Sequence, residues 1–311
     1  MKNVLLATTA LVFSAGFAAA EVTVTGSANM GFKYNEAGLG YADGKDAAGW
    51  YEIDMDVTGT MEADSGLTFG ANIELDSDYA ALTDRQSLAD VYECYLVEGF
   101  SDECAVGSNE TLSASVFVSG SFGTITVGAI DPIAEDYGLQ DIGFDGIGID
   151  DIAEDAGYIG EADIRWDYAT GDFTFGVSMH TIYEDYGLGI GYDQGAFNAA
   201  LTYDHFEGGS DDVNTTSLLL GYEANGFAGH IYVTDATDNG TSYGIYGSYV
   251  TGPWLFEAAY AKADDDSITA PGVDAYGIGA KYDLGGGAKL AGGLGSVDSD
   301  MVADLGVTFS F

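Results

Sequence analysis

Carboxylates are concentrated in one stretch of this 311-residue chain, which holds ten Asp or Glu residues and no Lys, Arg or His. Carboxylates packed this densely repel one another, and their field attracts cations. Rings of Asp and Glu commonly form the filters of cation-preferring pores. If the rest of the chain forms a pore, residues 131–161 would be its constriction loop. Its candidate pore-lining carboxylates are Asp131, Glu135, Asp136, Asp141, Asp145, Asp150, Asp151, Glu154 and Asp155.

A metal site is a second interpretation of the same stretch, because Ca²⁺ is a hard cation that oxygen ligands bind. The candidate ligands are Asp141, Asp145, Asp150, Asp151, Glu154 and Asp155. Their spacing matches no EF-hand, since Ile152 stands where the loop counted from Asp141 would need its twelfth-position glutamate. Solvated carboxylates screened by mobile ions are a third interpretation. We expect no required cofactor, and Ca²⁺ is the candidate ligand.

Catalytic motifs are not evident in the sequence. The three histidines, His180, His205 and His230, are scattered, and no Ser-His-Asp grouping, HExxH or phosphate-binding glycine motif accompanies them. Paired carboxylates are too common in this chain to indicate catalysis. We therefore expect no enzyme, and the competing non-channel interpretation is an acidic, secreted, β-rich adhesin or surface protein.

The elements that flank the acidic stretch alternate with a period of two, which is typical of β-strands. Residues 22–34, 50–62 and 67–77 each place large apolar side chains on one face and polar ones on the other. In a soluble sandwich the apolar face would point inward, whereas in a membrane barrel it faces lipid and the polar face lines water. The polar faces supply the candidate pore-wall residues Lys33, Glu52, Asp54, Asp56, Glu74, Asp76 and, further along, Arg165.

Sixteen such strands can be counted, an even number as a closed antiparallel barrel requires. They cover 22–34, 50–62, 67–77, 113–122, 124–130, 162–169, 173–181, 185–193, 197–206, 214–223, 227–235, 241–250, 254–262, 273–282, 287–295 and 300–311. No uncharged apolar run of about 18 residues follows residue 20, so no transmembrane helix is expected. The sequence predicts one all-β domain over 21–311, a 16-stranded antiparallel transmembrane β-barrel with an inward-folded constriction loop.

Aromatic residues recur five positions apart around short glycine-containing turns. If these turns held four residues, each pair would face each other across one hairpin. The sequence then predicts a ring of aromatic couples at the short-turn end, as at a membrane interface. The couples are Tyr168 with Phe173, Tyr192 with Phe197, Tyr222 with Phe227 and Tyr249 with Trp254.

The beginning of the chain is typical of a secretory signal at residues 1–20, with Lys2, an apolar middle and Ala18–Ala20. Without it, 7 basic and 51 acidic residues remain, a balance that disfavours nucleic acid and anionic lipid as partners.

In an exported protein, Cys94 and Cys104 predict a local disulfide in a surface loop.

Three segments of this chain resemble general diffusion porins of the alphaproteobacterial type. They are EVTVTGSANMGFKYN at the start of the predicted barrel, SVFVSGSFGTITVGAID, and the C-terminal run from Asp283 to Phe311. The terminal Phe311 resembles the assembly signal of outer-membrane barrels. The resemblance implies a homotrimer in the outer-membrane lipid of a Gram-negative bacterium, open to passive diffusion of ions and small hydrophilic solutes. A substrate-specific outer-membrane channel is the alternative within this class.

The chain departs from the pattern of that family at the constriction. The family sets acidic loop residues against a basic cluster on the opposite wall. Here the polar faces of residues 50–62 and 67–77 offer carboxylates and no arginine, and few basic residues have lumen parity. Those few are Lys33, Arg165, Lys281 and Lys289. We therefore predict a cation-preferring pore without a strong transverse field.

Overall fold

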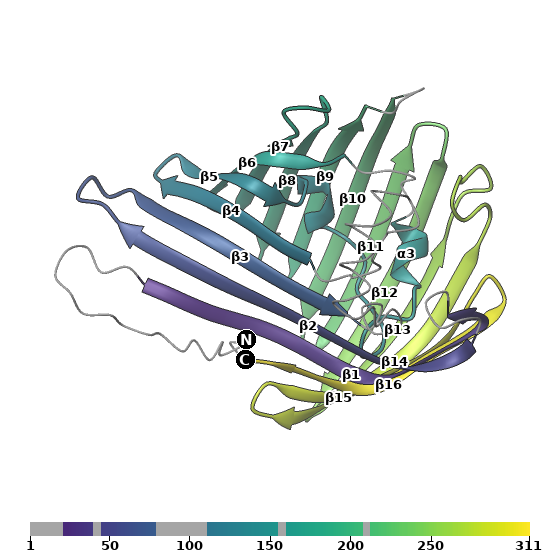
Figure 1. Ribbon diagram of the computed structural model, residues 1–311. Coiled ribbons are helices and arrows are strands. Elements are labelled where there is room, and N and C mark those ends of the chain that lie inside the picture. Colours follow the sequence, from purple (N-terminus) through teal and green to yellow (C-terminus); the bar gives the residue numbers. More distant parts are fainter. Residues whose placement is uncertain (1–20, 40–44, 79–110, 155–159, 208–211) are drawn as a thin grey trace, which may run out of the picture.

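A computed structural model of the chain shows one closed barrel of sixteen antiparallel strands, each paired with its neighbours in sequence (Figure 1). The structure describes residues 21–39, 45–78, 111–154, 160–207 and 212–311. The strands are β1 (Glu21–Leu39), β2 (Lys45–Glu62), β3 (Thr68–Asp78), β4 (Thr111–Gly120), β5 (Gly123–Ile130), β6 (Ala162–Thr170), β7 (Phe173–Met179), β8 (Tyr186–Gln194), β9 (Phe197–Phe206), β10 (Val213–Ala224), β11 (Phe227–Ala236), β12 (Gly240–Thr251), β13 (Trp254–Lys262), β14 (Asp274–Gly285), β15 (Ala288–Val297) and β16 (Asp300–Ser310). The predicted fold class and strand number are confirmed.

Three predictions concern residues outside the described part of the chain. They are the signal at residues 1–20, the disulfide between Cys94 and Cys104, and the place of Asp155 in the constriction. Within the described part, β1 and β2 are longer than predicted. After an irregularity in register following Tyr34, they pair again at Leu39 and Lys45, in a stretch whose sequence does not alternate.

The barrel closes where the first and last strands pair. β1 and β16 are in register from Ser27 opposite Ser310 to Asn35 opposite Val302. Gly26 and Phe311 then exchange two backbone N–H···O hydrogen bonds of 2.9 Å each. Phe311 therefore completes the last rung of the closing seam, and its role as an assembly signal stays a prediction.

The aromatic couples exist, but our prediction of the hairpins that hold them was wrong. The turns hold two residues, so that Thr170 faces Phe173 and Tyr168 faces Phe175. Residues five apart are consequently diagonal, and the aromatic couples form instead between strands whose connection lies at the opposite end of the barrel. The observed couples are Phe173 with Tyr192, Phe197 with Tyr222, Phe227 with Tyr249 and Trp254 with Tyr282, with ring centroids 5.0, 5.0, 4.4 and 4.7 Å apart.

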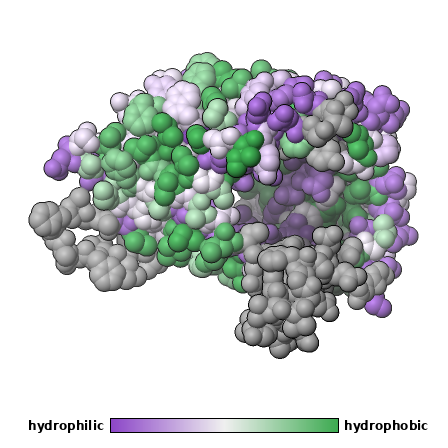
Figure 2. Space-filling view, turned by 45° about the horizontal axis from the view of Figure 1, so that its top comes forward, coloured by the Kyte–Doolittle hydropathy of each residue, from purple (hydrophilic) through white to green (hydrophobic). Residues whose placement is uncertain are grey.

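The two faces of the wall differ in polarity as the alternation predicted. Large apolar side chains cover the outside, for example Phe32, Leu112 and Leu305, which are 71%, 71% and 59% exposed. Figure 2 shows hydrophobic residues on this outer surface and hydrophilic ones in the hollow. No helix in the described ranges is long and apolar enough to cross a membrane. A barrel with an apolar exterior and a polar interior excludes the soluble sandwich.

Candidate functional site

The described residues of the acidic stretch, 131–154, lie inside the barrel, as predicted for a constriction loop (Figure 1). It contains a short 3-10 helix, η3 (Ile133–Asp136), and one helical turn, α3 (Asp150–Ala153). Helix η3 packs on β7, β8 and β9, and α3 packs on β11, β12 and β13. The loop therefore lies along the inner wall over much of the barrel's circumference.

Apolar side chains, rather than carboxylates, hold most of the loop against the wall. They share one buried cluster with inward-facing residues of β11–β14 and β16, such as Tyr232, Tyr246 and Ala261. Ile142 and Ile149 are each only 1% exposed. The loop members of the cluster are Leu139, Ile142, Ile147, Ile149, Ile152 and Ala153. The sequence analysis counted the loop's charges and missed this core.

Inward-facing glycines provide the space in which these side chains sit. A Cβ atom at Gly279 would lie 2.6 Å from Cγ2 of Ile142, and one at Gly277 would lie 2.5 Å from Cδ1 of Ile149. At the loop's root, a Cβ at Gly189 would lie 2.6 Å from Cγ1 of Ile133. Contacts this short are sterically forbidden, so larger residues at these wall positions would displace the loop.

Buried wall carboxylates bind the loop's backbone. Asp304 on β16 accepts hydrogen bonds from the N–H groups of Phe144 at 2.8 Å and Asp145 at 3.2 Å, and from Gly293 on β15 at 2.6 Å. Glu257 on β13 accepts the N–H of Gly143 at 3.2 Å. These carboxylates satisfy donors that would otherwise be buried without partners. Neither was predicted as a site residue, although each is a charge on the inward-facing side of its strand.

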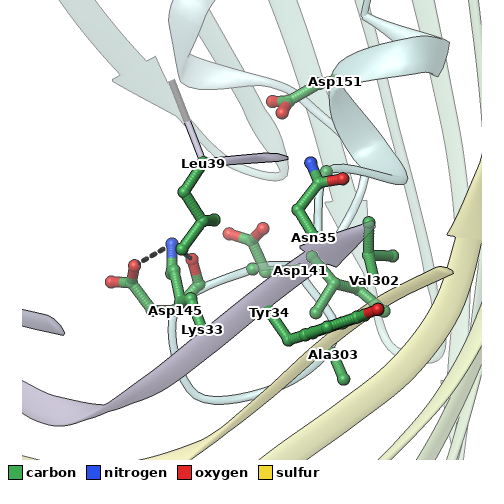
Figure 3. Close-up of a pocket in the computed structure, with 12 residues that line it drawn as sticks. Lys33, Tyr34, Asn35, Leu39, Asp141, Asp145, Asp151, Val302 and Ala303 are labelled. Carbon is green, nitrogen blue, oxygen red and sulfur yellow. Dashed lines mark hydrogen bonds and ion pairs between the residues drawn. The ribbon is translucent and has the colours of Figure 1, made fainter. Parts of the chain in front are cut away.

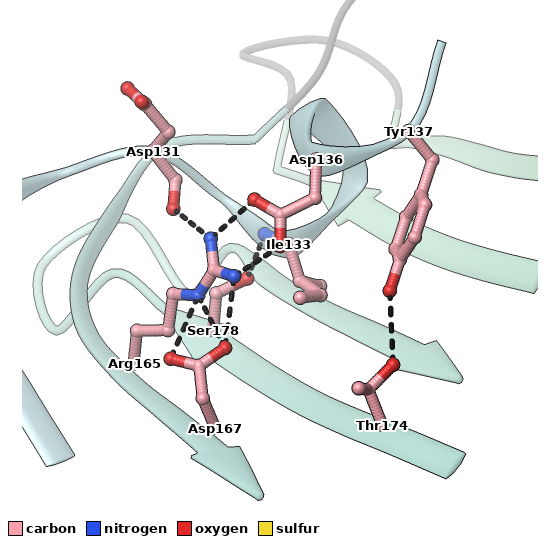
Figure 4. Close-up of polar contacts among 8 residues, drawn as sticks. All are labelled: Asp131, Ile133, Asp136, Tyr137, Arg165, Asp167, Thr174 and Ser178. Atoms are coloured by element: carbon pink, nitrogen blue, oxygen red, sulfur yellow. Dashed lines mark hydrogen bonds and ion pairs between the residues drawn. The ribbon is translucent and has the colours of Figure 1, made fainter. Parts of the chain in front are cut away.

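The wall's basic residues hold the loop rather than face it across an open passage. Lys33 on β1 forms an ion pair with Asp145 and donates to its backbone oxygen at 3.1 Å. At the loop's root, Arg165 on β6 binds Asp136 and Asp167 and donates to the backbone oxygen of Asp131 at 3.4 Å (Figure 4). Arg165 Nη1 lies 2.8 Å from Oδ1 of Asp136.

The predicted constriction carboxylates therefore separate into two groups. Asp136 and Asp145 are neutralised by the basic residues that they bind. Four others have exposed side chains and, in the described part of the chain, no Lys or Arg nitrogen within 4.0 Å of their carboxylate oxygens. These are Asp131, Glu135, Asp141 and Asp151. This second group is free to act on mobile ions.

Asp150 and Glu154 are partly buried between these groups. Burial, reinforced by the charges of Asp141 and Asp151, raises the pKa of Asp150 to about 8. Burial also raises the pKa of Glu154 to about 7, against the opposing effect of the N–H that Leu139 donates to it. The loop's charge consequently depends on pH in the neutral range.

The inner face of β2 and β3 is acidic, as predicted. Asp54 lies directly opposite Asp76 and Asp56 directly opposite Glu74 in the strand register. Asp54 accepts a hydrogen bond from Ser27, and Asn72 donates to both Asp56 and Glu74. Among described residues, no Lys or Arg lies within ion-pair distance of Asp54, Asp56 or Glu74. Like charges directly opposite are unfavourable in a sheet, so this wall also attracts cations.

The calcium prediction includes Asp155, which lies outside the described residues, so the structure describes five of its six candidate ligands. Among described residues, the group of three carboxylates with oxygen atoms mutually within 4.8 Å is Glu52, Asp54 and Asp76, on the wall. In the loop, Asp145 forms an ion pair with Lys33 and accepts a hydrogen bond from Asn29. Asp141 instead forms a hydrogen bond with Asp150. Calcium binding by the loop stays an untested prediction.

A closed transmembrane barrel, with a polar lumen narrowed by a loop docked inside it, defines a membrane channel. The profile of the Gram-negative porin family matches residues 7–301. Among curated proteins, the chain is 27% identical to a porin of Rhodobacter capsulatus and 26% identical to one of Fuscovulum blasticum. Each alignment covers 94% of this chain and 100% of the relative.

Solved structures agree on the fold. Mutants of Rh. blastica porin superpose with a TM-score of 0.70 at 21% identity, covering 93% of this chain and 100% of theirs. The chain belongs to the Gram-negative porin family. It is an outer-membrane channel protein with a multi-pass barrel, and not an enzyme.

Proposed function

We propose that this porin conducts ions and small hydrophilic solutes by passive diffusion and prefers cations. The observation that carries the proposal is the state of its lumen charges. Lys33 and Arg165 are paired with carboxylates, and Lys281 lies 3.4 Å from Glu257. Lys289 is the lumen lysine without such a pair in the described ranges. Four loop carboxylates and those of Asp54, Asp56 and Glu74 have no such pair in these ranges, and they therefore dominate the field in the water-filled passage.

Reversal potentials across a planar bilayer test this proposal. With the full-length mature protein in a KCl gradient, we expect the sign of the reversal potential to show that K⁺ is more permeant than Cl⁻. The preference should weaken as the salt concentration rises, because screening shortens the range of the carboxylate field. A potential of the opposite sign would overturn the proposal.

The cation preference should increase between pH 6 and pH 9. The raised pKa values of Asp150 and Glu154 mean that both carboxyls ionise over this range, with Asp141, Asp151 and the phenol of Tyr232 as their charged or titratable neighbours. For the same reason, the contribution of these two carboxyls to the docking of the loop is greatest below about pH 4, the range of ordinary carboxyl pKa values, and is lost as the pH rises through 7 and 8.

Reversal potentials at several pH values measure this effect. The double variant Asp150→Asn, Glu154→Gln should show a smaller pH dependence while still preferring cations, because the β2–β3 wall is unchanged. An unaltered pH dependence in the variant would contradict the assignment to these two residues.

We further propose that the channel assembles as a homotrimer. Support comes from its membership of a family of generally oligomeric porins. The apolar side chains of Met30 and Phe32 on the outer face of β1, which are 58% and 71% exposed, also offer a surface that a second subunit could cover. Chemical crosslinking in detergent measures the number of subunits.

A further inference from the structure

A pocket lies between the strand β1 and the middle of the constriction loop (Figure 3). Its cavity volume is about 290 Å³, at the lower end of the range for small-molecule sites. Carboxylates of Asp141, Asp145 and Asp151 face it together with the ammonium group of Lys33. Its lining also includes the aliphatic side chains of Leu39, Ile147 and Val302 and the polar side chains of Tyr34 and Asn35. The pocket therefore combines anionic groups with an apolar part.

The pocket's positive charge is already engaged. Lys33 pairs with Asp145, donates to the backbone oxygen of that residue at 3.1 Å, and lies 4.2 Å from the ring centroid of Trp50. Asp141 and Asp151 have no Lys or Arg nitrogen within 4.0 Å of their carboxylates in the described part of the chain. The pocket consequently presents two uncompensated negative charges and no free cation for an anionic group.

Two glycines make room for these carboxylates. Gly146 and Gly148 both have a φ of +75°, a conformation that side chains disfavour. A Cβ at Gly146 would lie 2.5 Å from Oδ1 of Asp141, and one at Gly148 would lie 3.4 Å from Oδ2 of Asp151. The backbone between Asp141 and Asp151 is thus shaped so that both carboxylates border the same cavity.

We propose that this pocket binds small organic cations that combine an ammonium group with a short aliphatic body. The ammonium would lie between Asp141 and Asp151, and the aliphatic part would contact Leu39 and Val302. A hydrated inorganic cation would leave the apolar lining unused, and a carboxylate-bearing solute would find Lys33 occupied. The inference rests on the proposed cation preference and gives it a substrate class, primary alkylammonium ions.

Block of K⁺ current in planar bilayers tests the site on the intact channel. Butylammonium chloride should reduce the current of the wild-type porin saturably, and methylammonium should do so more weakly because it lacks the aliphatic body. Potassium butyrate, an anion of similar size, should have no such effect. Equal block by methylammonium and butylammonium would overturn the proposal in favour of simple ion screening.

Two matched double variants locate the effect. Asp141→Asn with Asp151→Asn should raise the butylammonium concentration needed for half-block about tenfold, as expected for the loss of two partly screened ion pairs. Asp64→Asn with Asp298→Asn removes the same charge from exposed turns outside the lumen and should leave half-block nearly unchanged. Equal weakening in both variants would overturn the site. A channel that prefers K⁺ over Cl⁻ but shows no saturable block would refute this inference alone, whereas a preference for Cl⁻ would refute the proposed function.

Discussion

Neutralising the carboxylates of the β2–β3 wall is expected to remove most of the channel's preference for cations. The variant carries the four substitutions Asp54→Asn, Asp56→Asn, Glu74→Gln and Asp76→Asn. A unit charge about 4 Å away contributes about 1 kcal/mol even in water, a factor of about five in local ion concentration. We therefore expect the K⁺/Cl⁻ permeability ratio, measured from reversal potentials at low salt, to fall about tenfold.

Barrel stability should not fall in this variant. Asp54 faces Asp76 and Asp56 faces Glu74 directly across the strands, and amides in their place remove two like-charge pairs. Heat-modifiable mobility on gels therefore serves as a folding check. The control removes four carboxylates from exposed turns outside the lumen, Asp64→Asn, Asp172→Asn, Asp238→Asn and Asp298→Asn. If the control lowers the ratio as much as the wall variant, net charge rather than the wall determines selectivity.

Replacing Asp304 with alanine is expected to release the middle of the constriction loop. The carboxylate accepts three backbone hydrogen bonds, two of them from the loop residues Phe144 and Asp145. Leaving buried N–H groups unsatisfied costs about 1–3 kcal/mol each. A total of about 3 kcal/mol would shift the equilibrium between docked and released loop about a hundredfold. Single-channel conductance should rise and become noisier.

Two comparisons separate this effect from a mere loss of charge. Asp304→Asn keeps one carbonyl acceptor and should give a smaller change in conductance than Asp304→Ala. Asp54→Ala removes a lumen carboxylate that accepts a hydrogen bond from Ser27 on the wall, and it should leave the loop docked. A quiet channel of wild-type conductance in Asp304→Ala would show that the apolar contacts of Ile142 and Ile149 suffice to hold the loop.

The location of the constriction loop could be predicted from the sequence, but its attachment to the barrel wall could not. Its position after the fifth strand and its acidity predicted a constriction, and the structure places it in the lumen. Its attachment was missed because the partners are distant in sequence. Asp304 lies 160 residues from Phe144 in the sequence. Nothing in the sequence distinguishes Gly279 from the other glycines, and only the structure shows that Ile142 packs against it. Local patterns carry no information about such pairs.

The aromatic couples show the same limit on a smaller scale. Five-residue spacing correctly indicated aromatic residues at the short-turn end. The choice of partner depended on turn length, and two-residue turns moved each contact to the neighbouring strand, as between Phe227 and Tyr249. A change of two residues in a turn shifts the register of every opposed pair without altering which face a side chain occupies.

The sequence by itself determined the number of strands, the apolar exterior, the acidic wall and the location of the constriction loop. These follow from the two-residue period of a strand and from chain order, which are local properties. The tertiary structure decided which charges remain free. Lys33 and Arg165, which look like isolated basic residues of the pore wall in the sequence, meet Asp145 and Asp136 only when the loop folds inward. Because Coulomb interactions depend on distance in space, the balance of charge at the constriction was set by that closure.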